Sequence, residues 1–353
     1  MSLRNVALAL GAAALLAHAQ ETKTAEQVYK NIVALKGTPA DQLIPTMQFI
    51  SSALGLECGS CHVQGKFDAD DKQAKKSARE MIEMTLAINK GHFNGRLQIT
   101  CFTCHRGSEH PVSVPPVMES DAAPHPEMRA PSSGANPTPD EILAKYVAAV
   151  GGADAMKKIT TRVMTGKIIV GGNQAPIELY TKAPNKRISF SQMGSGHSIT
   201  AFDGTTGWLG NTGRPAREMS AAEAQAADLD AEFYLPLRIK EMFPQLRRGR
   251  PEEINGSLCD VLNASHPGQG PVRFYFDQKT GLLVRMLRLA DTPVGRNPTQ
   301  IDYADYRDAG GVKIPFRWTL ARTNGRFTIQ IDEVKNNVPI DDAKFAKPAG
   351  SVP

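Results

Sequence analysis

The chain has 353 residues, which is enough for two domains, and 41% of them are hydrophobic. The formal net charge is +5, and between Glu21 and Glu109 eleven Lys or Arg residues stand against ten Asp or Glu residues. So small an excess of charge gives no argument for a nucleic-acid partner, and none for strong electrostatic steering toward a charged protein.

Residues 1–19 have the composition of a secretory signal peptide. Arg4 forms a short basic region, Val6 to Ala17 is apolar, and Ala17-His18-Ala19 is an Ala-x-Ala cleavage site before Gln20. The apolar stretch is too short to span a bilayer, and no Cys follows it for lipid attachment. The pattern predicts cleavage and export to the periplasm or another extracytoplasmic space.

Three helices are predicted before residue 90. Thr24-Ala-Glu-Gln27 is a capping box, and the apolar spacing after it predicts a helix that ends at Gly37. Pro45 is typical of the first turn of a second helix, which runs to Leu54 with Gly55 as its cap. The third helix is predicted over Lys72–Asn89.

The pentapeptide Cys-x-x-Cys-His follows the second and the third predicted helix. In this motif two thiols add to the vinyl groups of a haem, and the adjacent His is the proximal iron ligand. The sequence therefore predicts two covalently bound haems c. Their attachment residues are Cys58, Cys61, Cys101 and Cys104, and their proximal ligands are His62 and His105.

These cysteines have other possible uses, as ligands of a zinc ribbon or as disulfides or a redox dithiol. The Cys pairs of a zinc ribbon are usually about 15–20 residues apart, whereas 39 residues separate Cys61 from Cys101. Disulfides or a redox dithiol would suit an oxidising compartment. Neither use requires a His directly after the second Cys, and both copies have one, so the haem interpretation is favoured.

An electron-transfer haem normally has both axial positions filled, and Met opposite His raises its potential. Met47 lies eleven residues before Cys58, on the apolar face of the helix that leads into the first motif. Any such Met has the alternative role of filling a gap in the core. The candidates for the second haem are Met84, Met81, His92 and His110.

A change of composition separates the two parts of the chain. Between Pro111 and Pro139 there are eight prolines and almost no periodic apolar pattern, which predicts a semi-extended linker over residues 112–137. Thr138-Pro-Asp-Glu141 is a second capping box, and it predicts a helix that runs to Gly151-Gly152.

After that helix the apolar period becomes two, which is typical of strands. A single helix is predicted among them, at Ala221–Ala231. So many strands indicate an α+β domain over residues 138–353, with an antiparallel sheet curled into a half-barrel or sandwich. The predicted strands are Arg162–Val170, Ile177–Lys182, Lys186–Met193, Val272–Asp277, Leu282–Leu287 and Phe327–Val334.

The fifth cysteine, Cys259, lies in the apolar run Leu258–Leu262 and is expected to be a small buried hydrophobic residue. The β-rich part of the sequence contains no cluster of His, Cys and Asp and no Gly-rich phosphate loop.

Residues 24–111 resemble the cytochrome c subunit of photosynthetic reaction centres. The resemblance lies in Met47-Gln-Phe-Ile-Ser-Ser-Ala-Leu-Gly-Leu-Glu-Cys58, Met84-Thr-Leu-Ala-Ile-Asn89 and Ile99-Thr-Cys-Phe-Thr-Cys-His-Arg-Gly107. In that family a helix supplies a Met ligand to the haem bound just after it, which implies Met47 and Met84 here. The family subunit has four haems, and this chain matches only its second half. Because the last haem there can take a His from elsewhere, the sixth ligand of the Cys101 haem stays open.

The β-rich part resembles outer-membrane lipoprotein carrier-like domains, which are half-barrels that cover an apolar cavity. The resemblance lies in Phe202-Asp-Gly-Thr-Thr-Gly-Trp208, Tyr275-Phe-Asp-Gln-Lys-Thr-Gly-Leu-Leu-Val284, Asp302-Tyr-Ala-Asp-Tyr306 and Gly311-Val-Lys-Ile-Pro-Phe316. It implies an antiparallel half-barrel and an apolar ligand, although fold alone does not settle function.

These features predict an exported dihaem c-type cytochrome, over residues 20–111, that carries single electrons and is not an enzyme. The resemblance implies a redox protein as partner, either a membrane reaction centre whose photo-oxidised donor is re-reduced or another electron-transfer complex. One alternative is a dihaem peroxidase with a five-coordinate iron. The other is a lipid-binding protein whose haems act as a redox sensor. Few contacts are expected between the two parts of the chain.

Overall fold

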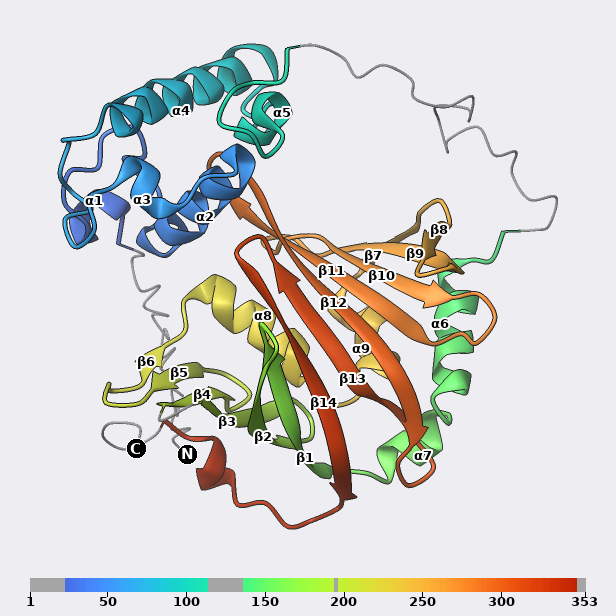
Figure 1. Cartoon of the computed structure of the whole chain (residues 1–353). Helices are drawn as coiled ribbons and strands as arrows, with labels where there is room; N and C mark the ends of the chain where they lie inside the picture. Colours follow the sequence, from blue (N-terminus) through green and yellow to red (C-terminus); the bar gives the residue numbers. More distant parts are fainter. Residues whose placement is uncertain (1–22, 114–135, 194–195, 348–353) are drawn as a thin grey trace, which may run out of the picture.

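The computed structural model describes residues 23–113, 136–193 and 196–347, and it shows a helical segment followed by a large antiparallel sheet (Figure 1). The predicted signal peptide and most of the predicted linker lie outside the described residues. A short 3₁₀ turn at Ala40–Gln42 precedes α2. The helices of the first segment are α1 Ala25–Val28, α2 Leu43–Leu54, α3 Cys58–Cys61, α4 Gln73–His92 and α5 Cys101–His105.

The second part carries four helices and fourteen strands among its described residues. Its helices are α6 Pro139–Ala149, α7 Ala153–Lys157, α8 Ala221–Ala231 and α9 Leu235–Met242, and a 3₁₀ turn covers Asp342–Phe345. Its strands are β1 Thr161–Val170, β2 Asn173–Lys182, β3 Lys186–Met193, β4 Gly196–Phe202, β5 Gly207–Asn211, β6 Arg217–Glu218, β7 Gln245–Arg248, β8 Glu252–Ile254, β9 Ser257–Ser265, β10 Val272–Asp277, β11 Leu283–Thr292, β12 Gly295–Asp308, β13 Lys313–Arg322 and β14 Gly325–Asn336.

The first predicted helix is wrong over most of its length. The capping box at Thr24 forms, but α1 ends at Val28 instead of near Gly37. Asn31 adopts a left-handed backbone with φ of 57°, which a helix cannot continue through. Its side-chain amide donates a hydrogen bond of 2.6 Å to the carbonyl of Asp68, so a tertiary contact overrides the local helical pattern.

The second and third predicted helices are confirmed with small shifts at their ends. α2 begins two residues before Pro45 and ends at Leu54, and Gly55 caps it in the left-handed conformation with φ of 66°. α4 continues three residues past the predicted end, to His92.

The sheet is antiparallel throughout, and neighbouring strands follow one another along the chain except where β1 pairs with β14 and where β7 pairs with β9. Its order is β6-β5-β4-β3-β2-β1-β14-β13-β12-β11-β10-β9-β7, with β8 paired to β9. Because β6 and β7 lie at opposite ends of this order, the sheet is open. The predicted antiparallel half-barrel is confirmed to this extent, a large open sheet that curves around its helices (Figure 1).

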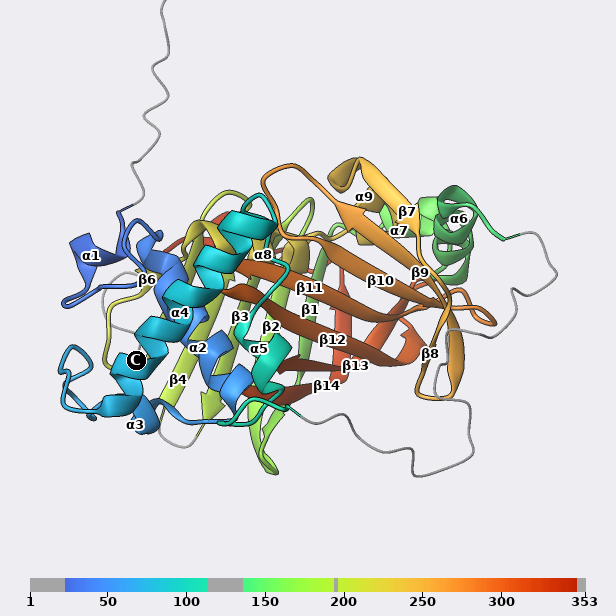
Figure 2. The same cartoon turned by 90° about the horizontal axis from the view of Figure 1, so that it is seen from above.

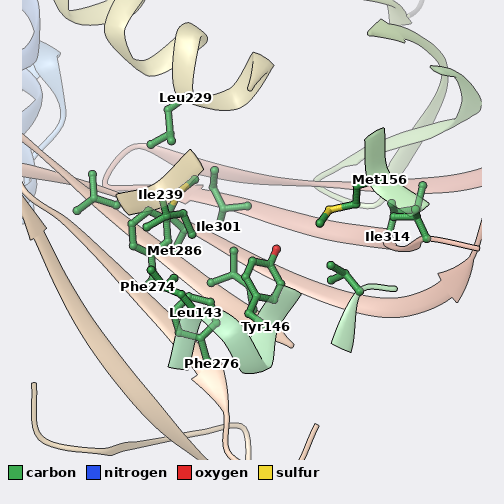
Figure 3. Close-up of a cluster of buried hydrophobic side chains, with 14 of the residues drawn as sticks. Leu143, Tyr146, Met156, Leu229, Ile239, Phe274, Phe276, Met286, Ile301 and Ile314 are labelled. Atoms are coloured by element: carbon green, nitrogen blue, oxygen red, sulfur yellow. The ribbon is translucent and has the colours of Figure 1, made fainter. Parts of the chain in front are cut away.

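The core of the second part lies between the sheet and helices α6, α7 and α9. Leu143 and Tyr146 of α6 face Phe274 and Phe276 of β10, and Ile239 of α9 adjoins them (Figure 3). Phe274 and Ile239 are fully buried. This packing explains why the sheet accepts strands of weak apolar pattern, since the helices cover its inner face.

The two parts of the chain meet at the turn between β11 and β12. Val294 in this turn is fully buried among the apolar side chains of α2 and its neighbours, and Asn297 Nδ2 donates a hydrogen bond of 2.6 Å to the carbonyl of Pro45. Figures 1 and 2 place α2 beside this end of the sheet. The expectation of few contacts between the parts is wrong at this turn. The cluster that it closes, called here the helical cluster, contains Ala25, Leu35, Leu43, Phe49, Ala53, Ile82, Cys101 and Val294.

Candidate haem-attachment site

Each Cys-x-x-Cys-His motif forms one short helical turn. In the first motif the amide of His62 donates a hydrogen bond of 2.9 Å to the carbonyl of Cys58. Residues three apart lie on the same side of a helix, so α3 presents Cys58 and Cys61 on one face. The Gly59 carbonyl between them accepts a hydrogen bond from Lys72 Nζ.

The second motif, α5, begins and ends at well-defined caps. The amide of Thr100 donates to the Thr103 hydroxyl at 3.0 Å, and Arg106 ends the helix with φ of 52°. The next amide, that of Gly107, donates a 2.8 Å hydrogen bond to the carbonyl of Ala53 in α2. A Cβ at Gly55 would overlap the Gly107 carbonyl, so α2 ends in close contact with the second motif.

Asn89 fixes the approach to the second motif. It lies near the end of α4 and is almost fully buried. Its Nδ2 donates to the carbonyl of Ile99 at 2.6 Å, and its Oδ1 accepts from the amides of Gln98 and Ile99 at 3.0 Å each. A buried side chain that bonds three backbone groups of one loop holds that loop in a single position.

Both motif histidines are oriented in the same way. The Nδ1–H of His62 donates to the Phe67 carbonyl at 2.9 Å, and the Nδ1–H of His105 donates to the Ser108 carbonyl at 3.0 Å. A carbonyl can only accept, so the proton is on Nδ1 and the lone pair is on Nε2. Within the described part of the chain, neither Nε2 has a hydrogen-bond partner. This is the arrangement expected of an iron-ligating His with its outer partner in place.

The four motif thiols differ in exposure. Cys101 is buried in the helical cluster, Cys61 is half-buried, and Cys58 and Cys104 are exposed. Burial raises the pKa of the Cys61 and Cys101 thiols. All five cysteines of the chain are unpaired, and no three His, Cys, Asp or Glu side chains converge in the described ranges. Among the described residues there is thus no disulfide and no cluster of three such ligands, and the redox dithiol stays open.

The candidate methionines lie on the helices that precede each motif. Met47 on α2 is half-buried and packs against the helical cluster. Met84 on α4 is 45% exposed and lies outside the buried stripe of that helix, which contains Ile82, Thr85 and Asn89. The other candidates, Met81, His92 and His110, are also exposed.

The helical segment exposes an unusual share of large apolar side chains. Ten are exposed among the described residues, and nine of them belong to this segment. Three examples are Phe67, after the first motif, Phe102, inside the second, and Met84. The donor set and the exposed side chains both fit two porphyrins that lie against the motifs.

Sequence reasoning did not identify the supporting residues Lys75, Asn89 and Val294. Each is almost fully buried. Asn89 could have been suspected, because a polar residue at the end of a helix before a motif often bonds the following loop. Nothing local distinguishes Lys75 from the other lysines of α4 or Val294 from an ordinary turn residue.

Paired Cys-x-x-Cys-His turns with histidines oriented in this way are the attachment pattern of c-type cytochromes. Residues 5–186, just over half of the chain, match the family described as photosynthetic reaction centre cytochrome C subunit. The chain belongs to this family.

Two curated relatives match over a limited region. The chain is 34% identical over 92 residues to the photosynthetic reaction center cytochrome c subunit of Thermochromatium tepidum, and 30% identical over 94 residues to that of Rubrivivax gelatinosus. These matches cover 25% and 26% of this chain, and 22% and 25% of the relatives. The chain thus spans about a quarter of the length of the curated relatives it matches.

Solved structures resemble the β-rich part weakly. A putative outer membrane lipoprotein-sorting protein domain from Vibrio parahaemolyticus has 12% identity and a TM-score of 0.42, and the match covers 59% of this chain and 95% of that chain. A LolA superfamily protein from Nitrosomonas europaea has 11% identity and a TM-score of 0.41, and the match covers 60% of this chain and 99% of that chain. No helix among the described residues is long and apolar enough to cross a membrane.

Proposed function

We propose that this chain is an exported dihaem c-type cytochrome that carries single electrons between redox proteins. The observation that supports it best is the matched geometry of His62 and His105, whose Nδ1–H groups are both held by backbone carbonyls. When bound, a haem iron supplies a one-electron couple between its ferric and ferrous states. The role of the polypeptide is to hold, orient and insulate the two groups.

In this proposal each residue type has one task. Cys58 and Cys61 hold one porphyrin and Cys101 and Cys104 the other, so the groups stay attached through changes of fold. His62 and His105 present Nε2 to the iron because their other nitrogen is bonded. Met47 is proposed as the distal ligand of the first haem and Met84 of the second, since a thioether favours the ferrous state.

The partner is proposed to be another redox protein. A reaction centre is one such partner, because the curated relatives carry that name. Proteins that pass electrons form small transient interfaces. We place the protein outside the cytoplasm, since residues 1–19 have the pattern of a cleaved signal peptide.

The central test is covalent attachment. Purified protein is denatured and extracted with acid and acetone, and its intact mass is measured. Two thioether-bound haems should remain with the polypeptide, and the mass should be that of the chain from about Gln20 plus two haems. Loss of all haem on extraction would contradict the proposal.

The same preparation separates electron transfer from peroxidase chemistry. Six-coordinate low-spin spectra for both haems are expected if Met47 and Met84 fill the distal positions. A high-spin component that binds cyanide or peroxide would instead indicate an open iron and the dihaem peroxidase.

The cavity beneath α6 and α9 gives an apolar ligand little room in this conformation. The cavity between α6, α9 and the sheet has a volume of about 100 Å³ and is lined by Tyr146, Arg162, Phe233, Tyr306 and their neighbours. Small-molecule sites usually have about 300–1,000 Å³. A lipid in this cavity would therefore have to displace the helices, and mass analysis of extracts from the purified protein tests for a bound lipid.

A further inference from the structure

The loop that follows the first motif is held by two basic residues of α4. Arg79 pairs with Asp70 at 3.0 Å, and a second nitrogen of its guanidinium donates to the carbonyl of Asn31 at 3.1 Å. Lys75 pairs with the other oxygen of Asp70 at 3.1 Å. The lysine side chain is only 10% exposed.

Lys75 also bonds the backbone of this loop. Its Nζ donates to the carbonyl of Phe67 at 3.0 Å and to that of Ala69 at 2.8 Å. The ammonium group thus makes two hydrogen bonds to the loop backbone and an ion pair with Asp70. A lysine is almost never buried without such partners.

The Phe67 carbonyl is also the acceptor for His62. Its oxygen receives the Nδ1–H of His62 at 2.9 Å and the Nζ–H of Lys75 at 3.0 Å. The corresponding acceptor for His105 is the Ser108 carbonyl, and no Lys or Arg side chain bonds that carbonyl among the described residues. The two histidines thus have the same hydrogen-bond geometry. Among the described residues, only the carbonyl that accepts from His62 also accepts a hydrogen bond from a cationic side chain.

We infer that Lys75 is a positioning residue that raises the reduction potential of the Cys58 haem and leaves that of the Cys101 haem unchanged. The inference rests on the proposed haem function. A hydrogen bond from Nδ1–H makes an imidazole more basic, which favours the ferric state. The ammonium group draws electron density from the shared carbonyl, which makes the carbonyl a weaker acceptor for the Nδ1–H group. The imidazole is then less basic, and the ferrous state is stabilised relative to the ferric state. Its positive charge also disfavours the ferric state.

The test compares Lys75→Met with Arg79→Met in the full chain. Both substitutions remove a cation of α4 that pairs with Asp70, but only the first removes a donor from the Phe67 carbonyl. Lys75→Met should lower one midpoint potential in a spectroelectrochemical titration. The equilibrium constant for reduction should fall about threefold to tenfold, which is about 28–59 mV for one electron. Arg79→Met should shift it much less.

A second measurement shows which haem responds. In NMR spectra of the reduced protein with labelled histidine, the Nδ1–H proton of His62 should move in Lys75→Met and that of His105 should not. Lys75→Gln, which keeps a donor without the charge, should give an intermediate potential and serves if Lys75→Met does not fold.

The outcomes distinguish this inference from the proposed function. If the wild-type protein lacks two covalent haems, the proposed function fails first. If it has both haems and Lys75→Met leaves both potentials unchanged, or if Arg79→Met shifts them equally, the role of Lys75 is overturned and the proposed function stands.

Discussion

Gly295, the first residue of β12, lies so close to the ring of Phe49 in α2 that a Cβ at this position would overlap the ring. The neighbouring Val294 is fully buried in the helical cluster. Because α2 also carries Met47, a residue from the far end of the sequence supports the helix that we propose as the source of an iron ligand. The β-rich part therefore contributes a side chain to the core of the helical segment.

Gly295→Ala should destabilise this junction. Added volume in a packed site typically costs about 1–3 kcal/mol, because neighbours must shift. Chemical denaturation should show this loss, and the absorption band of Met–iron coordination should weaken as α2 moves. Gly91→Ala on α4 is the matched control, since a Cβ there meets no atom within 4 Å. Equal behaviour of the two variants would mean that the turn does not support α2.

Met47→Ala should remove the Met–sulfur band of one haem and lower the potential of that haem, because the soft ligand of the ferrous state is lost. Visible spectra near the red edge and a redox titration measure both effects. Unchanged spectra and potentials would leave Met47 as a core residue only. Met84→Ala is expected to do the same for the second haem, and Met81 and His92 are tested next if it does not.

The number of free thiols provides an independent check on attachment. The chain has five cysteines, and four of them should be consumed by thioether bonds. Cys259 is fully buried, and burial raises the pKa of its thiol to about 11, so it should not react in the native protein near neutral pH. Thiol titration should give none before denaturation and one after it. Five thiols after denaturation would contradict covalent attachment.

The loop after the first motif should lose stability in acid. Hydrogen bonds from Arg79, Asn31 and Lys75 hold the pKa of Asp70 well below its usual range. The charged form is therefore favoured by folding, and its contribution is complete above the unfolded pKa of about 3.9 and is lost as the pH falls toward the folded value.

This acid effect is measured as the difference in unfolding free energy between the wild-type protein and Asp70→Asn. The difference should be constant above about pH 5 and should shrink below about pH 4. Asp68→Asn, which removes a carboxylate two residues earlier in the same loop and leaves the ion pairs of Asp70 in place, is the control. A difference that grows in acid would show that Asp70 is not stabilised as the charged form.

A chain that ends near Pro115 should still bind two haems, because both motifs precede that residue. It lacks Val294, however, so Leu43 and Phe49 lose the side chain that covers them. Its unfolding free energy should be lower, and its Met47 band weaker, than in the full chain. A chain that starts near Asn136 should fold as a β-rich protein without haem, as circular dichroism and a haem stain would show.

The sequence correctly predicted those elements whose ends are set by interactions between residues close together in the chain. The capping boxes at Thr24 and Thr138 form, and β3, β10 and α8 have the predicted ends. Other strands were not predicted from the sequence. One of them is β12, which is rich in polar residues and contains a proline. Its place is set by hydrogen bonds to β11 and β13, which no window of its own sequence reports.

In the candidate site, too, some residues could be predicted from the sequence and others could not. The motif residues are read directly from the sequence, since the chemistry requires adjacent Cys and His. The partners that orient them are different in kind: His62 depends on a carbonyl five residues away, and Asn89 on the loop before Cys101. The carbonyl that His62 bonds is set by the path of the loop backbone, which the residue types do not report.

The burial of Cys101 beneath the helical cluster has a consequence for biogenesis. The cluster is completed by Val294, which follows Cys101 in the chain by almost two hundred residues. Until Val294 docks, the thiol of Cys101 lacks part of the apolar cover that it has in the folded chain. If a haem is attached at Cys101 as proposed, attachment is expected to precede docking of the turn.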